Sequence, residues 1–350
     1  ASLRSARNEA VLIGRLAWRL GSAVTWELRW HPFRGEWVLF TAHRGARPWI
    51  GEVVEDEEPS VPEDNALAPR GKRIATTNPD YRGVFTFTND LPVFSQEAPE
   101  PSPGDELYRT QRAVGTAEVV CYHHDPTKSM ADLDDDELTA VVTTWRDRTE
   151  ALEALDGVAH VLIFENRGAA VGTSNPHPHC QIYAGAMVYA TMAREAEVAA
   201  EHHGRTGRTL LEDVTERERA GPRVISEGET FFACVPWFAR YAYEVHVLPR
   251  RPMASLVALD DAGCRSLGLV LRDVVRRYDA LWGLRMPYVL AVHQAPVGDH
   301  PHYPFHVELH PPLRAPGLLK YLAGPEVGGG SMTNESDPDE KAAELRDALD

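Results

Sequence analysis

Cysteine is scarce in this sequence, and its few cysteines are isolated from one another. Only Cys121, Cys180, Cys234 and Cys264 occur among the 350 residues, and none belongs to a Cys-x-x-Cys pair. This usage argues against a disulfide framework, because such frameworks need cysteines in spatially matched sets. It favours free or buried thiols in a reducing, cytoplasmic setting.

Long hydrophobic runs and an excess of positive charge are missing as well. No apolar stretch reaches membrane-spanning length and the N-terminus shows no secretory pattern, so we expect no membrane association. The formal net charge of −16 disfavours nucleic acid as a partner, because the phosphate backbone would be repelled. With 43% hydrophobic residues the chain is typical of a globular protein of one large or two ordinary domains.

What the chain does contain is an internal duplication. Leu133-Asp134-Asp135 and, 126 positions later, Leu259-Asp260-Asp261 each begin a predicted helix, because paired aspartates cap and charge a first turn favourably. An apolar strand follows each helix, at 158–164 and 288–292. A second strand with spaced histidines comes next, at 177–181 in one half and 306–310 in the other, and we match these two segments to each other.

This repetition predicts an α+β fold. We expect two fused repeats, each an antiparallel sheet with packed helices, that form one pseudo-symmetric unit. Further strands are predicted at 26–30, 36–40, 84–88, 116–122, 230–236 and 243–248. The domain division is an N-terminal extension at 1–24, a first repeat at 25–186 and a second repeat at 187–350.

The most informative motif is His177-Pro178-His179, with Gln181 two residues further on. An extended strand places residues i, i+2 and i+4 on one face, so the side chains of His177, His179 and Gln181 are predicted to converge on one pocket. Pro178 favours that conformation by restricting its own φ and the residue before it. A neutral imidazole there can attack phosphorus, and an amide can donate to a phosphoryl oxygen. A bare His-x-His is equally compatible with a metal pair or a surface accident.

Several further motifs give the sequence a family resemblance. It resembles the galactose-1-phosphate uridylyltransferases, the two-repeat branch of the histidine triad superfamily. The resemblance runs from about residue 30 to residue 349. Its landmarks, besides the His-Pro-His-x-Gln core, are HRGARPW at 43–49, NPDY at 78–81, FTND at 87–90, FENRGAA at 164–170 and KYLAG at 320–324.

The resemblance implies a ping-pong transfer of a nucleoside monophosphate. His179 would be the nucleophile that attacks the α-phosphorus of UDP-glucose, releases glucose 1-phosphate and holds a uridylyl group for galactose 1-phosphate. The backbone at His177 is expected to accept the other ring N–H of His179 and so to fix the tautomer. Gln181 is expected to donate to a non-bridging oxygen.

The resemblance also implies binding residues. Contacts to the nucleotide and its phosphates would come from Arg44, Arg47, Asn89, Asp90, Asn166, Gly172 and Ser174. Contacts to the sugar phosphate would come from Lys320 and Glu326. From the residue types alone, the arginines fit surface salt bridges, and Asn89 and Asp90 fit a turn, as well as they fit a ligand.

Two metal sites of the family differ in how far this chain preserves them. The first usually has a Cys-x-x-Cys pair where this chain reads Asn65-Ala66-Leu67-Ala68, and a histidine near Pro126, so we predict that zinc site to be absent. The second can be built from Glu195, His293, His306 and Glu308, a set that suits one zinc or iron. The alternative for these four residues is a hydrogen-bonded polar cluster.

The expected partners are a UDP-sugar, a sugar 1-phosphate and a second copy of the chain in a homodimer. The sequence leaves the base and the sugar open, so an ADP-sugar phosphorylase and a transferase for another sugar 1-phosphate remain alternatives. A histidine-triad hydrolase is disfavoured by Gln181, which stands where that branch has a third histidine. A non-catalytic nucleotide binder is disfavoured by the presence of both His179 and Gln181.

Overall fold

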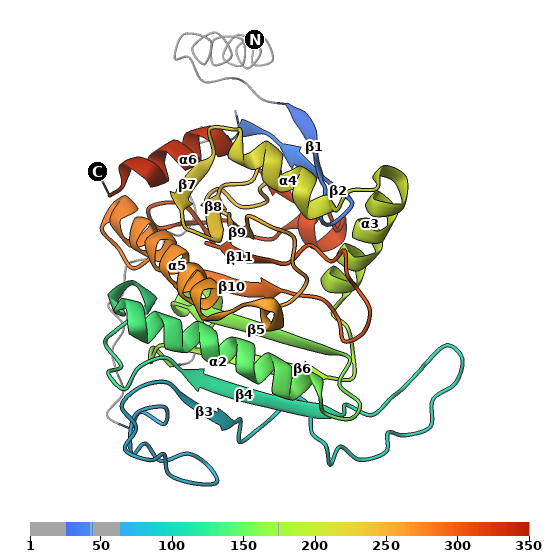
Figure 1. Ribbon diagram of the computed structural model, residues 1–350, viewed down its shortest axis with the longest axis vertical. Coiled ribbons are helices and arrows are strands. Elements are labelled where there is room, and N and C mark those ends of the chain that lie inside the picture. Colours follow the sequence, from blue (N-terminus) through green and yellow to red (C-terminus); the bar gives the residue numbers. More distant parts are fainter. Residues whose placement is uncertain (1–25, 43, 45–63, 174, 350) are drawn as a thin grey trace, which may run out of the picture.

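A nine-stranded antiparallel sheet forms the centre of the protein (Figure 1). The structure of the protein is a computed structural model, which describes residues 26–42, 44, 64–173 and 175–349. The strand order is β3-β4-β6-β5-β10-β11-β9-β8-β7. The bounds are β3 Phe85–Thr88, β4 Gly115–Cys121, β5 His160–Arg167, β6 His179–Gly185, β7 Val224–Glu227, β8 Phe231–Cys234, β9 Val245–Pro249, β10 Tyr288–His293 and β11 His306–His310.

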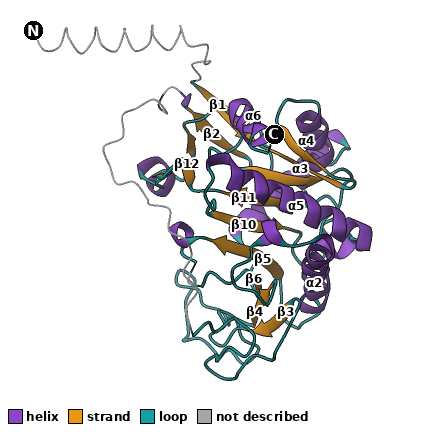
Figure 2. Ribbon diagram, turned by 90° about the vertical axis from the view of Figure 1, so that its left-hand side faces the viewer, coloured by secondary structure: helices purple, strands orange, loops and turns teal. Residues whose placement is uncertain are grey.

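The two long helices begin where the aspartate pairs predict them. In α2 (Asp135–Glu153) the side chain of Asp134 accepts the first backbone N–H groups, and in α5 (Asp261–Trp282) Asp260 does the same. Both helices pack against one face of the sheet, side by side (Figures 1 and 2). The other helices of the described chain are α3 Ala190–Thr206, α4 Leu210–Arg219 and α6 Pro338–Asp347, with single turns η2 Met130–Asp132, η3 Ala169–Val171, η4 Leu256–Ala258 and η5 Gly324–Gly328.

The second half of the sheet is covered on both faces. Val245 and Val247 of β9 belong to the large core under α2 and α5, whereas Leu248 belongs to a separate cluster with residues of α3 and α4. Because neighbouring residues of a strand point to opposite faces, these two clusters lie on opposite sides of the sheet. Phe33, from the turn of an N-terminal hairpin, completes the second cluster.

The first half of the sheet is covered by α2 on one face, and on the other face Val119 and Cys121 of β4 pack in a small cluster with Tyr81. In β6, Cys180, Ile182 and Ala184 belong to the main core, while His179, Gln181 and Tyr183 are only half-buried on the other face. Strand β6 therefore presents two of the predicted functional side chains on a face that the described helices leave open.

Two small sheets complete the molecule. One has the order β1-β2-β14 and the other is the β12–β13 hairpin. Their bounds are β1 Glu27–His31, β2 Glu36–Phe40, β12 Leu313–Ala315, β13 Leu318–Leu319 and β14 Thr333–Asn334. Within the described residues, we find no helix with both the length and the apolar character needed to cross a membrane.

The strand order confirms the α+β fold. Strands β5 and β10 pair at the centre, and β6 and β11 pair with their outer edges. The two halves thus repeat the same order outward from a central antiparallel pair, as expected for a pseudo-symmetric unit.

Candidate active site

The ring of His179 is held in one tautomer at the start of β6. Its Nδ1 lies 2.7 Å from the carbonyl oxygen of His177, which can only accept, so Nδ1 donates and Nε2 keeps its lone pair. Burial lowers the pKa of His179 below its ordinary value of 6.5, and the hydrogen bond to His177 offsets this only in part. The imidazole is therefore neutral at physiological pH, and among the described residues Nε2 has no hydrogen-bond partner on the face of the sheet that the helices leave uncovered.

Gln181 follows His179 on the same face of β6. It pairs across the sheet with Val119 of β4 and with Phe164 of β5. Phe164 and Tyr183 form an edge-to-face aromatic pair with ring centroids 4.8 Å apart. The Gln181 side chain therefore has apolar cross-strand neighbours on the same face of the sheet as His179.

A loop rich in small residues adjoins β5 on this face. The carbonyl of Asn166 accepts the hydroxyl of Thr173 at 2.6 Å, which folds the loop back on the end of the strand. Gly172 has a φ of +79°, and a Cβ built on it would meet no atom within 4 Å. The loop is therefore open towards solvent at Gly172, where a ligand can approach the backbone closely. Ser174 lies outside the described residues.

The ring of His177 takes a different place from the one predicted. Strand β6 begins at His179, and the buried ring of His177 bonds to the amide of Asn65 through Nδ1 (3.2 Å) and to the hydroxyl of Tyr81 through Nε2 (2.9 Å). Burial lowers its pKa to about 4. The predicted convergence of three side chains is corrected to two, because His177 contributes its carbonyl oxygen, and its ring serves the surrounding loop.

The other predicted nucleotide contacts lie in separate environments. Arg44 pairs with Glu335 at 3.3 Å, and Arg47 lies outside the described residues. Asp90 accepts from Arg73 Nη1 and from the backbone N–H of Ile74, both at 2.8 Å, and Asn89 accepts from Leu91. Asn89 and Asp90 are thus held in a defined turn beside a guanidinium that the sequence did not single out.

Lys320 and Glu326 contact each other in the second half of the chain. Lys320 Nζ lies 3.3 Å from Glu326 Oε1 and also donates to the carbonyl of Thr333, and Glu326 accepts from the backbone of Ala323. In the described structure neither residue bonds to His179 or Gln181. Lys320 and Glu326 therefore contact each other, and within the described chain they do not contact the proposed nucleophile.

The four predicted metal ligands do form one buried cluster. Candidate ligand atoms of Glu195, His293, His306 and Glu308 all lie within 4.8 Å of one another. His293 bridges two carboxylates, with Nδ1 2.9 Å from Glu195 and Nε2 3.2 Å from Glu308. Burial alone would lower the pKa of His293, but the two carboxylates outweigh it and raise this pKa to about 9.

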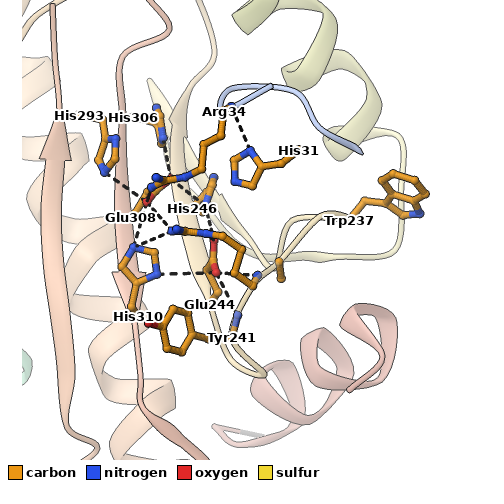
Figure 3. A network of polar contacts seen from close by, with 12 residues as sticks. His31, Arg34, Trp237, Tyr241, Glu244, His246, His293, His306, Glu308 and His310 are labelled. Atoms are coloured by element: carbon orange, nitrogen blue, oxygen red, sulfur yellow. Dashed lines mark hydrogen bonds and ion pairs between the residues drawn. The ribbon is translucent and has the colours of Figure 1, made fainter. Parts of the chain in front are cut away.

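The cluster continues into residues that the sequence did not reveal (Figure 3). A second set with ligand-like spacing shares Glu308 and adds His31, Glu244 and His246. Two arginines also bond to Glu308, namely Arg34 at 2.7 Å and Arg240 at 3.0 Å. Glu244 and His246 are two residues apart in a predicted strand, and this spacing was the sequence signal that could have indicated the second set. The other members come from distant segments.

The repeat relationship also needs a correction. His306 donates its Nδ1–H to the carbonyl of Pro304 at 2.7 Å, just as His179 does to His177, and each histidine begins its strand. His306 therefore corresponds to His179, not to His177 as the sequence match had it, and Glu308 corresponds to Gln181. In the second half, the face of β11 that corresponds to the functional face of β6 is buried and is occupied by charged side chains that bond to Glu308.

The cavity beside β7 does not belong to this site. It has a volume of about 620 Å³ and lies on the helix-covered side, between β7 and α5. Its arginines already bond to acidic or backbone partners, such as Arg265 to Asp135 and Arg277 to Asp273. None of the predicted site residues lines it.

Comparisons with known proteins bear on the whole chain. Residues 22–188 match the family model of the galactose-1-phosphate uridyl transferase N-terminal domain, and residues 194–350 match that of its C-terminal domain. The chain is 34% identical over 330 residues to a galactose-1-phosphate uridylyltransferase of Haemophilus influenzae, covering 92% of this chain and 93% of that protein. It is 33% identical to one of Rattus norvegicus, covering 91% and 86%.

Solved structures agree on the fold. A uridylyltransferase structure superposes with a TM-score of 0.77 at 27% identity, covering 92% of this chain and 98% of that one. An ADP-glucose phosphorylase from Arabidopsis thaliana superposes with a TM-score of 0.75 at 22% identity, covering 91% and 97%. The second likeness, at that identity, concerns the fold alone.

Proposed function

Because this chain belongs to the galactose-1-phosphate uridylyltransferase family, we propose that it transfers a uridylyl group from UDP-glucose to galactose 1-phosphate through a uridylyl-His179 intermediate. The observation that carries the proposal is the neutral ring of His179, whose Nδ1–H is bound to His177 and whose Nε2 has no hydrogen-bond partner among the described residues. An imidazole prepared in this way is a nucleophile that needs no separate base.

The transfer takes place in two balanced displacements. The Nε2 lone pair forms a bond to the α-phosphorus while the bond to the bridging oxygen breaks, and glucose 1-phosphate leaves with that electron pair. A phosphate oxygen of the incoming sugar phosphate then attacks the same phosphorus, and the P–N electron pair returns to Nε2. The Gln181 amide stabilises the negative charge that builds on a non-bridging oxygen, a contact that typically changes rates by about a hundredfold or more.

The remaining predicted residues take their places around this centre in the proposal. Asn166, Gly172 and Ser174 line the loop beside the α-phosphate, Asn89 and Asp90 hold the uridine, and Arg44 and Arg47 contact phosphate oxygens, for which guanidinium forks are well suited. His177 contributes through its carbonyl. Glu195, His293, His306 and Glu308, the set expected to hold a zinc or iron, already bond to one another and to two arginines, so they do not fit a metal ion, and no step of the transfer passes through one.

A homodimer completes the proposal. Lys320 and Glu326, the expected sugar-phosphate contacts, bond within their own half of the chain, and in the proposal they complete the site of a second copy. The β1–β2 hairpin offers an apolar surface for such contact, since Leu28 faces Leu39 and Trp30 faces Trp37 on its outer side. Leu28 is 58% exposed and Trp37 52% exposed, an unusual amount of apolar surface on one hairpin.

Positional isotope or label exchange tests the covalent intermediate directly. Labelled glucose 1-phosphate should enter UDP-glucose in the absence of any acceptor, because the first displacement is reversible. Running ADP- and GDP-sugars in parallel identifies the base. Absence of exchange with every donor contradicts the intermediate, and release of free monophosphate instead would indicate a hydrolase.

The pH dependence of the first displacement follows from the neutral His179. Protonation of Nε2 removes the nucleophile, so kcat/KM with UDP-glucose should fall on acidification. Because the pKa of His179 is lowered, this fall should be centred below 6.5, with a plateau at higher pH. UDP-glucose suits the measurement because its diphosphate does not titrate in this range. An acid limb centred above 6.5 contradicts the assignment.

A further inference from the structure

Glu308 has cationic partners at the oxygen that a metal ion would need. Its Oε2 accepts from Arg34 Nη2 at 2.7 Å and from Arg240 Nη2 at 3.0 Å, and all of its side chain is buried. Charge-assisted hydrogen bonds of this kind are among the strongest in proteins. A divalent ion bound there would have to displace both guanidinium groups or lie beside them, and two like charges at such distances repel strongly in a buried site.

The ring of His293 is also oriented for hydrogen bonding, whereas Nε2 of His31 and Nδ1 of His246 are buried without a hydrogen-bond partner among the described residues. Both nitrogens of His293 face carboxylates, an arrangement that the doubly protonated ring satisfies and that leaves it no lone pair for a metal. The Nδ1 of His31 lies 3.3 Å from the backbone N–H of Arg34 and accepts from it, which places the ring proton on Nε2. Of the histidines in the two candidate sets, His306 has the arrangement typical of a ligand, with Nδ1 bound to a carbonyl.

The carboxylates of the cluster already have cationic and imidazole partners. Arg34 and Arg240 bond to Glu308, and Arg240 also lies 3.6 Å from Glu244. His293 and His310 contact Glu308 as well, at 3.2 Å and 2.9 Å, in an interior that does not tolerate unpaired charge. A divalent cation added to this set would have to displace these partners from the same oxygen atoms.

Arg34 also connects two distant parts of the chain. It lies in the turn between β1 and β2, and its guanidinium reaches Glu308 of β11 and the hydroxyl of Thr191 in α3 (Figure 3). Phe33 of the same turn stacks on His306 with ring centroids 4.6 Å apart. The turn therefore fills the position opposite β11, and the N-terminal hairpin is anchored by the same contacts that occupy the cluster.

We propose that this cluster is a metal-independent ionic network in which Arg34 and Arg240 supply the positive charge that zinc or iron would otherwise supply. The guanidinium of Arg34 both excludes a divalent cation from Glu308 and holds the N-terminal hairpin on β11. Neither role is part of the transfer reaction, so the test is independent of substrate.

Metal content and metal affinity test the proposal. The wild-type protein, expressed in medium supplemented with zinc and iron, should contain substoichiometric metal, and a chelator should leave its melting temperature unchanged. Arg34→Met removes the charge and keeps much of the side-chain volume. This variant should bind Zn²⁺ or Co²⁺ on the order of a hundredfold more tightly than wild type, because a buried like charge has been removed. The d–d absorption bands of Co²⁺ report coordination without any assay of activity.

Arg194→Met is the matched control. Arg194 lies on α3, is partly exposed and pairs with Glu197, so its replacement should not create a site. One equivalent of metal in the wild type that disappears in His306→Ala would overturn the proposal. So would an Arg34→Met variant that folds but binds Co²⁺ no better than wild type. If Arg34→Met fails to fold, the wild-type metal content and the chelator experiment still decide the matter.

Discussion

Uridylyl transfer is expected to disappear when His179 is replaced by alanine, while binding of UDP-glucose stays measurable. The substitution removes the atom that forms the bond to phosphorus, and a neighbouring water cannot take over the covalent route. Losses on the order of 10⁴-fold or more are typical when a covalent nucleophile is deleted. Steady-state turnover and label exchange measure the loss, and calorimetric titration with UDP-glucose measures the binding that remains.

A second histidine serves as the control for this experiment. His302 stacks on His203 with ring centroids 3.6 Å apart and lies in the loop before β11, so His302→Ala should keep near-normal turnover. Comparable activity in the His179→Ala and wild-type proteins contradicts the assignment of the nucleophile. Loss of UDP-glucose binding together with turnover would instead place the main role of His179 in binding.

The largest loss of stability is expected from Glu308→Ala. This change removes the shared partner of Arg34, Arg240 and His293 and leaves excess positive charge in a fully buried site. Removing one partner of a buried ion pair typically costs about 3–5 kcal/mol of the free energy of unfolding, because the remaining charge stays desolvated. Denaturant unfolding, followed by fluorescence and by circular dichroism, measures the change.

Glu197→Ala is the matched control for the carboxylate deletion. Glu197 pairs with Arg194 on the surface of α3, where its side chain is 64% exposed. Such exposed pairs contribute about 1 kcal/mol or less, since both partners remain hydrated when separated. If Glu308→Ala is no less stable than Glu197→Ala, the network does not have the structural importance that its burial indicates.

Most strands and both long helices could be predicted because their causes are local. The strand predicted at 116–122 from its strand-like composition is β4, which spans Gly115–Cys121, and the strand predicted at 36–40 coincides with β2. The aspartate caps located the starts of α2 and α5. Helix α3 was missed, although Gly207 marks its end with a left-handed φ of +73°, since Tyr189, the N-cap residue before it, offers no capping side chain.

The metal prediction shows that residue types can indicate which side chains meet but not which other side chains bond to them. Glu195, His293, His306 and Glu308 do meet in space, as their types and positions indicated. The two arginines that share Glu308 come from residue 34, in a hairpin turn, and residue 240, in a loop. No periodicity links those positions to 308, because contacts across 274 and 68 residues depend on how the whole chain packs.

Local patterns were enough to specify the α+β class and the repeated strand–helix–strand order, and the family resemblance singled out His179. Packing decided the rest, namely that His177 turns its ring to Tyr81 and Asn65, that His306 is the counterpart of His179, and that arginines fill the second half. The physical reason is the distance along the chain over which each kind of interaction acts. Capping, strand alternation and proline restriction act between residues a few positions apart, whereas burial and charge balance depend on every segment that meets at one place.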